Sequence, residues 1–150
     1  MEKMFEIFGK IFFIAQQWQV AGDRELGRIG LTTKQWMLLA VLEKMTASKS
    51  PTVTETARAF GTSRQNVKRI AADLEAKGFI EIIRDGSDHR IQRFRLTGLH
   101  HPLFDTPENQ EWQAGFIARF FQGISAEQLD NMQEGINTLL ENLHAGTHED

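Results

Sequence analysis

The sequence predicts a mainly α-helical fold with a small β-hairpin, an α+β arrangement. Three observations carry this prediction: a short capped helix that begins at Thr52, a basic helix over residues 63–77 after a turn at Gly61, and two β-rich runs on either side of a polar loop. Helix, turn, helix and hairpin in this order are the parts of a winged helix-turn-helix.

The helix boundaries have local signals of their own. Thr52 and Glu55 have the spacing of a capping box, and Gly61 can take the left-handed conformation that ends a helix. Ser63 then offers a second N-cap. Apolar residues at three-to-four spacing give the second helix a core stripe, made of Val67, Ile70, Ala71 and Leu74. The other side of that helix is polar.

The polar side of the second helix has the residue types that read DNA. Arg can donate to guanine O6 and N7, Gln and Asn can pair with adenine, and Lys can neutralise a phosphate. The helix N-terminus also favours a phosphate. The alternative is the ordinary solvated face of a surface helix. The candidate DNA-binding residues here are Ser63, Arg64, Gln65, Asn66, Lys68 and Arg69.

The hairpin supplies a second candidate contact. Residues 79–83 and 92–96 have strand composition, and the polar loop between them is too long for a two-residue turn, so we expect a flexible, projecting wing. A guanidinium near its tip suits a narrow minor groove, where the negative potential is enhanced. Without the preceding helix pair this would be an ordinary hairpin loop. The candidate wing residues are Asp88, His89 and Arg90.

Composition and charge are those of one ordinary globular domain, here residues 1–150, with 41% hydrophobic and 25% charged residues. The net charge is −3, but it is unevenly distributed. Residues 50–96 hold nine basic and six acidic residues, whereas the rest of the chain holds eight and 14. A basic module on an acidic body fits a protein that touches DNA with one face.

Several segments resemble the MarR family of bacterial regulators, and together they extend over most of the chain: residues 31–36, 54–57, 63–67, 74–80, 85, 88–90 and 96–97. The resemblance implies a homodimer whose recognition helix enters the major groove of double-stranded DNA. It also implies that Arg90 probes the minor groove, steadied by Asp88, and that a small aromatic or anionic ligand releases the DNA. One departure is that Gly98, Pro102 and Pro107 interrupt the long helix that follows the Leu-Thr pair in the family.

The terminal helices are the predicted dimer interface. Residues 1–22 form an amphipathic helix whose apolar surface is wider than one face of a small domain covers, and glycines 22, 27 and 30 are expected to mark its end. Residues 106–145 continue with Thr106 as N-cap, a capping box of Ser125 with Gln128, and a leucine-rich seam up to Gly146. The alternative is that these surfaces pack within one chain.

A further helix over residues 32–44 begins with a capping box of Thr32 and Gln35. It should lie mostly buried under the DNA-reading region, residues 31–97. Trp36 on this helix and Trp18 on the first are candidates for lining a ligand pocket, although core packing is the commoner role for such a residue. Residues 47–51 have the composition of a linker.

The absence of cysteine excludes a cysteine-ligated zinc site. His100 and His101 with Asp105, or His144 with His148, could hold zinc, but adjacent histidines in a proline-containing loop are not a metal spacing, and His144 and His148 lie on either side of Gly146, where the helix should end. We expect solvated or capping histidines, with residues 98–105 as a loop and 147–150 as a frayed tail. No metal or other cofactor is predicted.

No motif of an enzyme, a signal peptide or a membrane-spanning segment is present in the sequence. We therefore expect a cytoplasmic, non-enzymatic protein that is not bound to a membrane. Two functions remain open. One is a dimeric transcriptional regulator, most simply a repressor, that binds a pseudo-palindromic operator; the other is a winged-helix protein interaction module without DNA contact.

Overall fold

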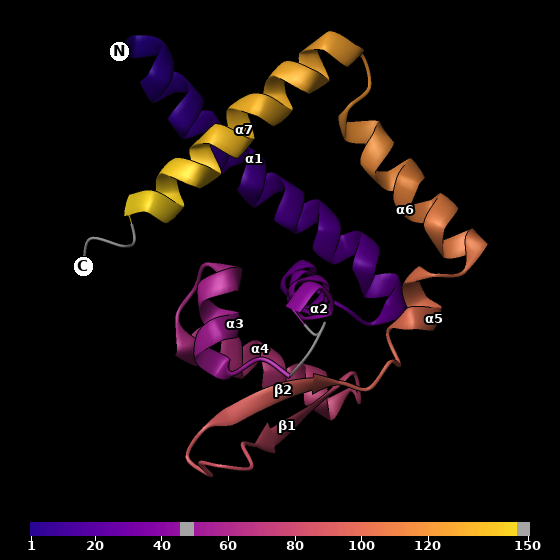
Figure 1. Ribbon diagram of the computed structural model, residues 1–150. Coiled ribbons are helices and arrows are strands. Elements are labelled where there is room, and N and C mark those ends of the chain that lie inside the picture. Colours follow the sequence, from indigo (N-terminus) through magenta and orange to yellow (C-terminus); the bar gives the residue numbers. More distant parts are fainter. Residues whose placement is uncertain (46–49, 147–150) are drawn as a thin grey trace. The chain divides into compact units, whose positions relative to one another are not determined.

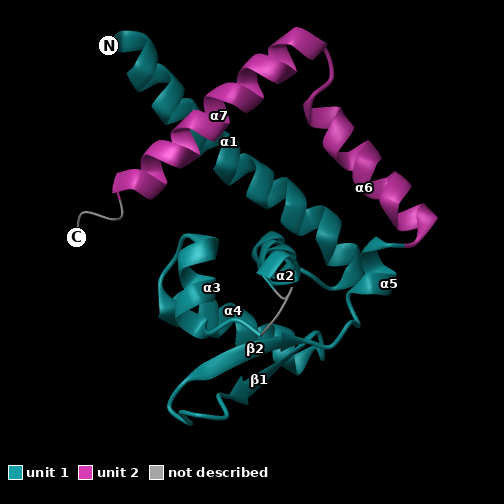
Figure 2. Cartoon of the chain, in the orientation of Figure 1, with its two compact units in different colours: residues 1–105 teal, residues 106–150 magenta. Residues whose placement is uncertain are grey.

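A computed structural model describes residues 1–45 and 50–146 (Figure 1). The elements are α1 (Glu2–Leu26), a 3-10 helix (Gly27–Ile29), α2 (Thr33–Met45), α3 (Val53–Phe60), α4 (Arg64–Ala76), β1 (Ile80–Arg84), β2 (Gln92–Leu96), α5 (His101–Phe104), α6 (Pro107–Phe120) and α7 (Ala126–Gly146). The chain divides into two compact units, Met1–Asp105 and Thr106–Asp150, which are coloured separately in Figure 2. The predicted fold class is confirmed.

The first unit contains the helix-turn-helix and its hairpin. Strands β1 and β2 pair antiparallel, with Ile82 opposite Phe94. Helix α2 packs on α3 and α4, and α4 packs on β1. The core between them is made of completely buried side chains, among them Leu38, Leu39, Leu42, Val67, Leu74, Ile80 and Phe94. The predicted core stripe of α4 is confirmed, because Val67, Ile70, Ala71 and Leu74 are all buried.

Local capping explains where the helices of this unit begin. The amide of Glu55 donates to Thr52 Oγ1 at 3.1 Å, and the amide of Thr52 donates to the Glu55 carboxylate at 2.7 Å. The predicted capping box at Thr32 and Gln35 is present too. The same Gln35 side chain also accepts from Lys77 Nζ at 2.8 Å, so this cap ties α2 to the end of α4.

The first helix continues through Gly22 and ends at Leu26 with Gly27 as its C-cap, so of the glycines predicted to mark a break or helix end, Gly27 does so and Gly22 does not. Gly22 serves instead as the point where α1 approaches the start of α2. Thr33 donates from Oγ1 to the Gln19 carbonyl at 3.1 Å and from its amide to Asp23 at 2.7 Å. Because these bonds bring Thr33 against the Gly22 backbone, no room is left for a side chain at position 22.

The segment predicted as a loop, residues 98–105, contains the short helix α5. Gly98 has a φ of 83°, and the amides of His101, Leu103 and Asp105 donate to carbonyls three or four residues back. Pro102 does not prevent this helix, because a proline in the first helical turn has no amide bond to lose. The expectation of a loop was therefore wrong at its centre.

The second unit consists of α6 and α7. Thr106 caps α6 by accepting from the Asn109 amide, and Ser125 and Gln128 form the predicted capping box at α7. No described residue of α6 or α7 is buried. The exposed apolar side chains of this unit include Ile117, Phe120, Leu129, Met132, Ile136, Leu139, Leu140 and Leu143.

The N-terminal part of α1 is equally apolar and exposed. Phe5, Phe8, Phe12 and Phe13 are each more than half exposed. Within the described residues, no helix combines the length and the hydropathy that crossing a bilayer requires. The predicted linker at residues 47–51 lies mostly outside the described residues, and the predicted tail at 147–150 lies wholly outside them.

The close approach at Gly22 gives a testable prediction. Gly22→Ala should lower the free energy of unfolding by about 1–3 kcal/mol, because the new Cβ would overlap Thr33 Oγ1, which is held by its bond to Gln19. Gly9→Ala in the same helix is the matched control. Its Cβ would meet nothing within 4 Å, so the better helix propensity of Ala should stabilise the chain by up to about 1 kcal/mol.

Urea unfolding of the three proteins measures both effects. Equal free energies of unfolding for the two variants would show that the contact between α1 and α2 does not require a glycine at position 22.

Candidate nucleic-acid interface

Helix α4 presents its polar side to solvent because its opposite side is fixed in the core. Ser63 caps the helix by accepting from the Asn66 amide at 3.1 Å, so its hydroxyl is engaged in folding. The side chains of Arg64, Gln65, Lys68 and Arg69 are exposed. Exposed cationic and amide groups therefore stand on the first two turns, where the helix dipole also attracts an anion.

Asn66 differs from its neighbours because it is half buried and held on both sides. Its Nδ2 donates to Thr62 Oγ1 at 3.0 Å, and its Oδ1 accepts from Arg69 Nη2 at 3.1 Å. An adenine would have to replace these partners before Asn66 could pair with it. Among the described residues, no side-chain hydrogen bond of Arg64 or Gln65 was found, so neither would have to give up a partner before pairing with a base.

In the wing, the Arg90 guanidinium is oriented by Asp88. Arg90 Nε and Nη2 each donate to one oxygen of the Asp88 carboxylate at 3.1 Å, and the Arg90 amide donates to the same group at 3.0 Å. This hydrogen bonding lowers the pKa of Asp88 and raises the pKa of Arg90. The Arg90 side chain is nevertheless 91% exposed. Asp88 thus fixes the direction of the Arg90 guanidinium, and the remaining N–H groups of the guanidinium can still donate to DNA.

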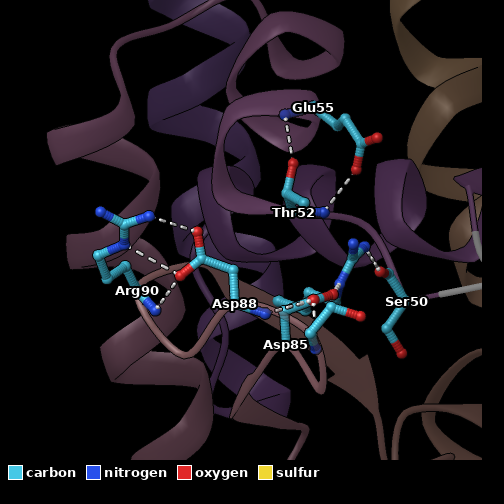
Figure 3. A network of polar contacts seen from close by, with 8 residues as sticks. Ser50, Thr52, Glu55, Asp85, Asp88 and Arg90 are labelled. Atoms are coloured by element: carbon cyan, nitrogen blue, oxygen red, sulfur yellow. Dashed lines mark hydrogen bonds and ion pairs between the residues drawn. The ribbon is translucent and has the colours of Figure 1, made fainter.

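The base of the wing is closed by an ion pair between Asp85 and Arg93, which are both largely buried. Figure 3 shows Asp85 in one network of polar contacts with Asp88 and Arg90. Arg93 Nε donates to Asp85 at 2.5 Å, and Arg93 Nη1 donates to the Ser50 carbonyl at 2.8 Å. The other Asp85 oxygen accepts from the amides of Ser87 and Asp88 at 3.0 and 3.2 Å. These bonds, led by the one from Arg93, hold the pKa of Asp85 well below its usual range.

Further hydrogen bonds join the two sides of the loop, while its flexibility stays a prediction. Asp85 and Ile91 are joined by a further backbone bond across its neck, and the Arg84 guanidinium donates to the His89 carbonyl at 2.7 Å. His89 itself is exposed. A preformed wing loses less conformational freedom when it binds than a mobile one does.

Helix α4, the wing and the start of α3 meet around one groove of about 470 Å³. It is lined by Thr52, Val53, Thr54, Arg64, Gln65, Lys68, Arg90, Ile91 and Gln92. Three cations from two separate elements thus share one concave surface, which concentrates positive potential there. Of the predicted residues, the groove brings together Arg64, Gln65, Lys68 and Arg90; it is not lined by Ser63, Asn66, Arg69, Asp88 or His89.

Sequence reasoning assigned no site role to several residues of this region. The groove is also lined by Thr52, Val53, Thr54, Ile91 and Gln92, while Asp85 and Arg93 position the wing. Thr54 was hidden within a capping box, and Gln92 within a strand. The one signal for Asp85 and Arg93 was a pair of opposite charges at the two strand ends, which the expected hairpin would have brought close.

The two tryptophans predicted to line a ligand pocket lie outside this groove. Trp36 is half buried on α2, and Trp18 is 42% exposed on α1. Neither lines the groove described above, so a pocket at these residues stays a prediction.

The histidines at α5 differ from expectation. His100 is buried and bonds through Nε2 to Glu43 of α2 at 2.8 Å, so the expected solvated or capping role is wrong for this residue. His101 Nδ1 lies 3.1 Å from Asp105, as its position four residues before Asp105 allows. His144 is described, whereas His148 lies outside the described residues.

These features define a winged helix-turn-helix protein with a cationic groove. Residues 29–91 match the sequence model of the MarR family, which confirms the predicted resemblance. The transcriptional activatory protein BadR of Rhodopseudomonas palustris is 29% identical over 97 residues. That alignment covers 65% of this chain and 55% of BadR, so the chain spans about half the length of this relative.

Solved structures show the same fold over nearly the whole chain. The crystal structure of MarR has a TM-score of 0.76 at 20% identity and covers 93% of this chain and 98% of MarR. CouR from Rhodococcus jostii RHA1, solved with bound p-coumaroyl-CoA, has a TM-score of 0.70 at 17% identity and covers 89% of this chain and 90% of CouR. The fold is that of the MarR-family transcriptional regulators.

The ion pair at the base of the wing predicts a pH dependence. The pKa of Asp85 is lower in the folded chain than its unfolded value of ~3.9, so the ionised carboxylate stabilises the fold. This contribution to the free energy of unfolding is complete above about pH 4 and is lost as the pH falls towards the folded pKa. Asp85→Asn should therefore be less stable than the natural chain near neutral pH, and the difference should shrink below about pH 4.

Urea midpoints measured across this pH range test the assignment. Asp73→Asn, at an exposed position of α4, is the control and should show a much smaller difference at every pH. If the difference in urea midpoint between Asp85→Asn and the natural chain stayed constant down to about pH 2, the ion pair of Asp85 with Arg93 would not be the source of the stability.

Proposed function

We propose that the chain is a sequence-specific transcriptional regulator that binds double-stranded DNA as a homodimer on a pseudo-palindromic operator. The observation that supports this most directly is the single groove in which Arg64, Gln65 and Lys68 of α4 and Arg90 of the wing face solvent. In this proposal α4 enters the major groove, where the Arg64 fork can reach guanine O6 and N7. Arg90 then enters the adjacent minor groove.

Phosphate and base contacts have different tasks in this interface. Lys68, Arg69 and the amides at the start of α4 neutralise or bind phosphates, which sets affinity and register. Arg64 and Gln65 supply the choice of sequence. Such a regulator acts where the DNA is, in the cytoplasm of a bacterial cell, and needs no catalytic group.

Selection of bound fragments from random duplexes, at a stated salt concentration, tests the function. A two-fold symmetric motif with half-sites about one helical turn apart is expected. No enrichment over the starting pool would favour the second function, a winged-helix module that binds a protein. That alternative gives no reason for exposed cations on both α4 and the wing.

Arg64→Ala should cost about 1–3 kcal/mol in binding to the selected duplex and relax the preference at one base position per half-site. The reason is the loss of a two-pronged donor to guanine. Asn66→Ala should have a similar effect on affinity, with an added contribution from the lost contacts to Thr62 and Arg69. A repeated selection with each variant provides the measurement, and an unchanged motif for Arg64→Ala would remove this residue from base reading.

Arg90→Ala should weaken binding and lower the slope of log affinity against log salt by about 1. Arg28→Ala is the control, because Arg28 lies in the 3-10 helix, bonds Glu25 at 3.2 Å and is not a groove residue. Titrations at several salt concentrations give both slopes. Identical slopes for Arg90→Ala and the natural chain would place the wing outside the interface.

The homodimer is supported by the apolar side chains that α1, α6 and α7 leave exposed. Large apolar side chains left exposed in such number on a helix usually mark an interface. Sedimentation should give twice the chain mass of 17.1 kDa at micromolar concentration. Ile136→Asp with Leu140→Asp should give a folded monomer, because both side chains are exposed on α7 and the charges would be buried in the dimer.

Asn137→Asp adds a charge to the polar side of the same helix and should leave the dimer intact. A monomer for the natural chain would contradict the dimer, as would a double variant that stays dimeric.

The proposed regulator also responds to a small aromatic or anionic ligand. CouR is described with bound p-coumaroyl-CoA, a ligand of both kinds, and Trp18 and Trp36 are the aromatic residues that we assign to such a site. A ligand can release the DNA only if it binds the DNA-free arrangement of the dimer more tightly than the DNA-bound one. A bound dimer then represses or activates according to where its operator lies; BadR is named an activatory protein.

A further inference from the structure

Three potential metal ligands meet where α2 ends and α5 begins. Glu43 lies in the last turn of α2, and His100 and His101 lie at the start of α5. One ligand atom of each residue can be chosen so that all three lie within 4.8 Å of one another. The two imidazole rings are 4.2 Å apart at their centroids, with 34° between their planes. All three residues belong to the first unit.

His100 faces Glu43 through its Nε2 atom. Its side chain is 93% buried, with only 7% of its surface exposed. Nε2 is therefore the ring nitrogen through which His100 can bind an ion together with Glu43. The Glu43 carboxylate, 2.8 Å from His100 Nε2, supplies negative charge beside the same ring.

His101 is prepared as a ligand by its neighbour. Its Nδ1 lies 3.1 Å from the Asp105 carboxylate. When Nδ1 donates its proton to Asp105, the lone pair is left on Nε2, which is the arrangement of a carboxylate that orients a metal-binding histidine. The side chains of Glu43 and His101 are each about half exposed, at 50% and 52%, so an ion can reach them from solvent.

We propose that Glu43, His100 and His101 bind a divalent transition metal ion of the zinc type, with Asp105 as the carboxylate that orients His101. Two imidazoles and one carboxylate are a ligand set that zinc uses when a fourth position is left to water. Metal-to-ligand bonds of ~2.0–2.2 Å place neighbouring ligand atoms about 3.4 Å apart in a tetrahedron. The ligand atoms now lie within 4.8 Å of one another, and rotation of the exposed Glu43 and His101 side chains can bring them to this shorter distance.

Binding exchanges one contact for another. The hydrogen bond between His100 and Glu43 gives way to bonds from both residues to the ion. Because a ligand imidazole must be unprotonated, affinity rises with pH. The ion then connects the end of α2 to the segment that follows the wing. This connection is independent of the DNA-binding groove, since none of the three ligands lines it.

Titration of untagged, metal-free protein with Co²⁺, followed by its visible absorption, tests the proposal, and Zn²⁺ should displace the Co²⁺. One ion per chain is expected. Glu43→Gln and His101→Gln should each weaken binding at least tenfold, and Asp105→Asn by about 10- to 100-fold. These three positions are exposed, so their variants should fold; circular dichroism verifies this without relying on a variant of buried His100.

His144→Gln is the matched control, because it removes a histidine from the second unit and should leave Co²⁺ affinity unchanged. In parallel, Zn²⁺ should raise the melting temperature of the natural chain and not that of Glu43→Gln. The proposal is overturned if the natural chain binds no Co²⁺, if the Glu43 and His101 variants bind it as well as the natural chain, or if only His144→Gln loses it.

Discussion

The ion pair between Asp85 and Arg93 is the interaction on which the arrangement of this winged region depends. Arg93 donates to Asp85 on one side and to the Ser50 carbonyl on the other. The Phe94 amide adds a bond to the Pro51 carbonyl, and Phe94 itself is completely buried in the core. The hairpin is thereby joined to the segment that leads into the capping box of α3.

From this pair a continuous series of contacts reaches the tip of the wing. Asp85 accepts from the Asp88 amide, and the Asp88 side chain orients Arg90. The position of the Arg90 guanidinium relative to α4 is therefore set by bonded neighbours, while α4 is set by its core stripe. Two elements that carry cations therefore face one groove.

The features that could be predicted from sequence are those that depend on near neighbours. Capping boxes link residues three apart, and the core stripe of α4 repeats every three or four residues, so both were visible in the sequence and were confirmed. The groove-lining cations of α4 could be proposed in the same way, because a fixed buried side determines the exposed one.

The features that could not be predicted join distant residues. Arg93 and Ser50 are 43 residues apart, and His100 and Glu43 are 57 apart, so no spacing rule connects them. Gly22 was misread for a related reason: a glycine in a helix reads as a break unless the close approach of Thr33 is known. Residues 98–105 were predicted as a loop because of Gly98 and Pro102, but Pro102 lies in the first turn of α5, where a helix tolerates proline.

In the proposed complex the wing stands in the minor groove next to the site that α4 reads. The chain has no cysteine, so Ser87→Cys provides a single attachment point for an iron chelate that cleaves DNA nearby. On the selected duplex, cleavage should fall in the minor groove, about half a helical turn from the centre of each half-site. Cleavage spread evenly along the duplex, or none at all, would contradict the account.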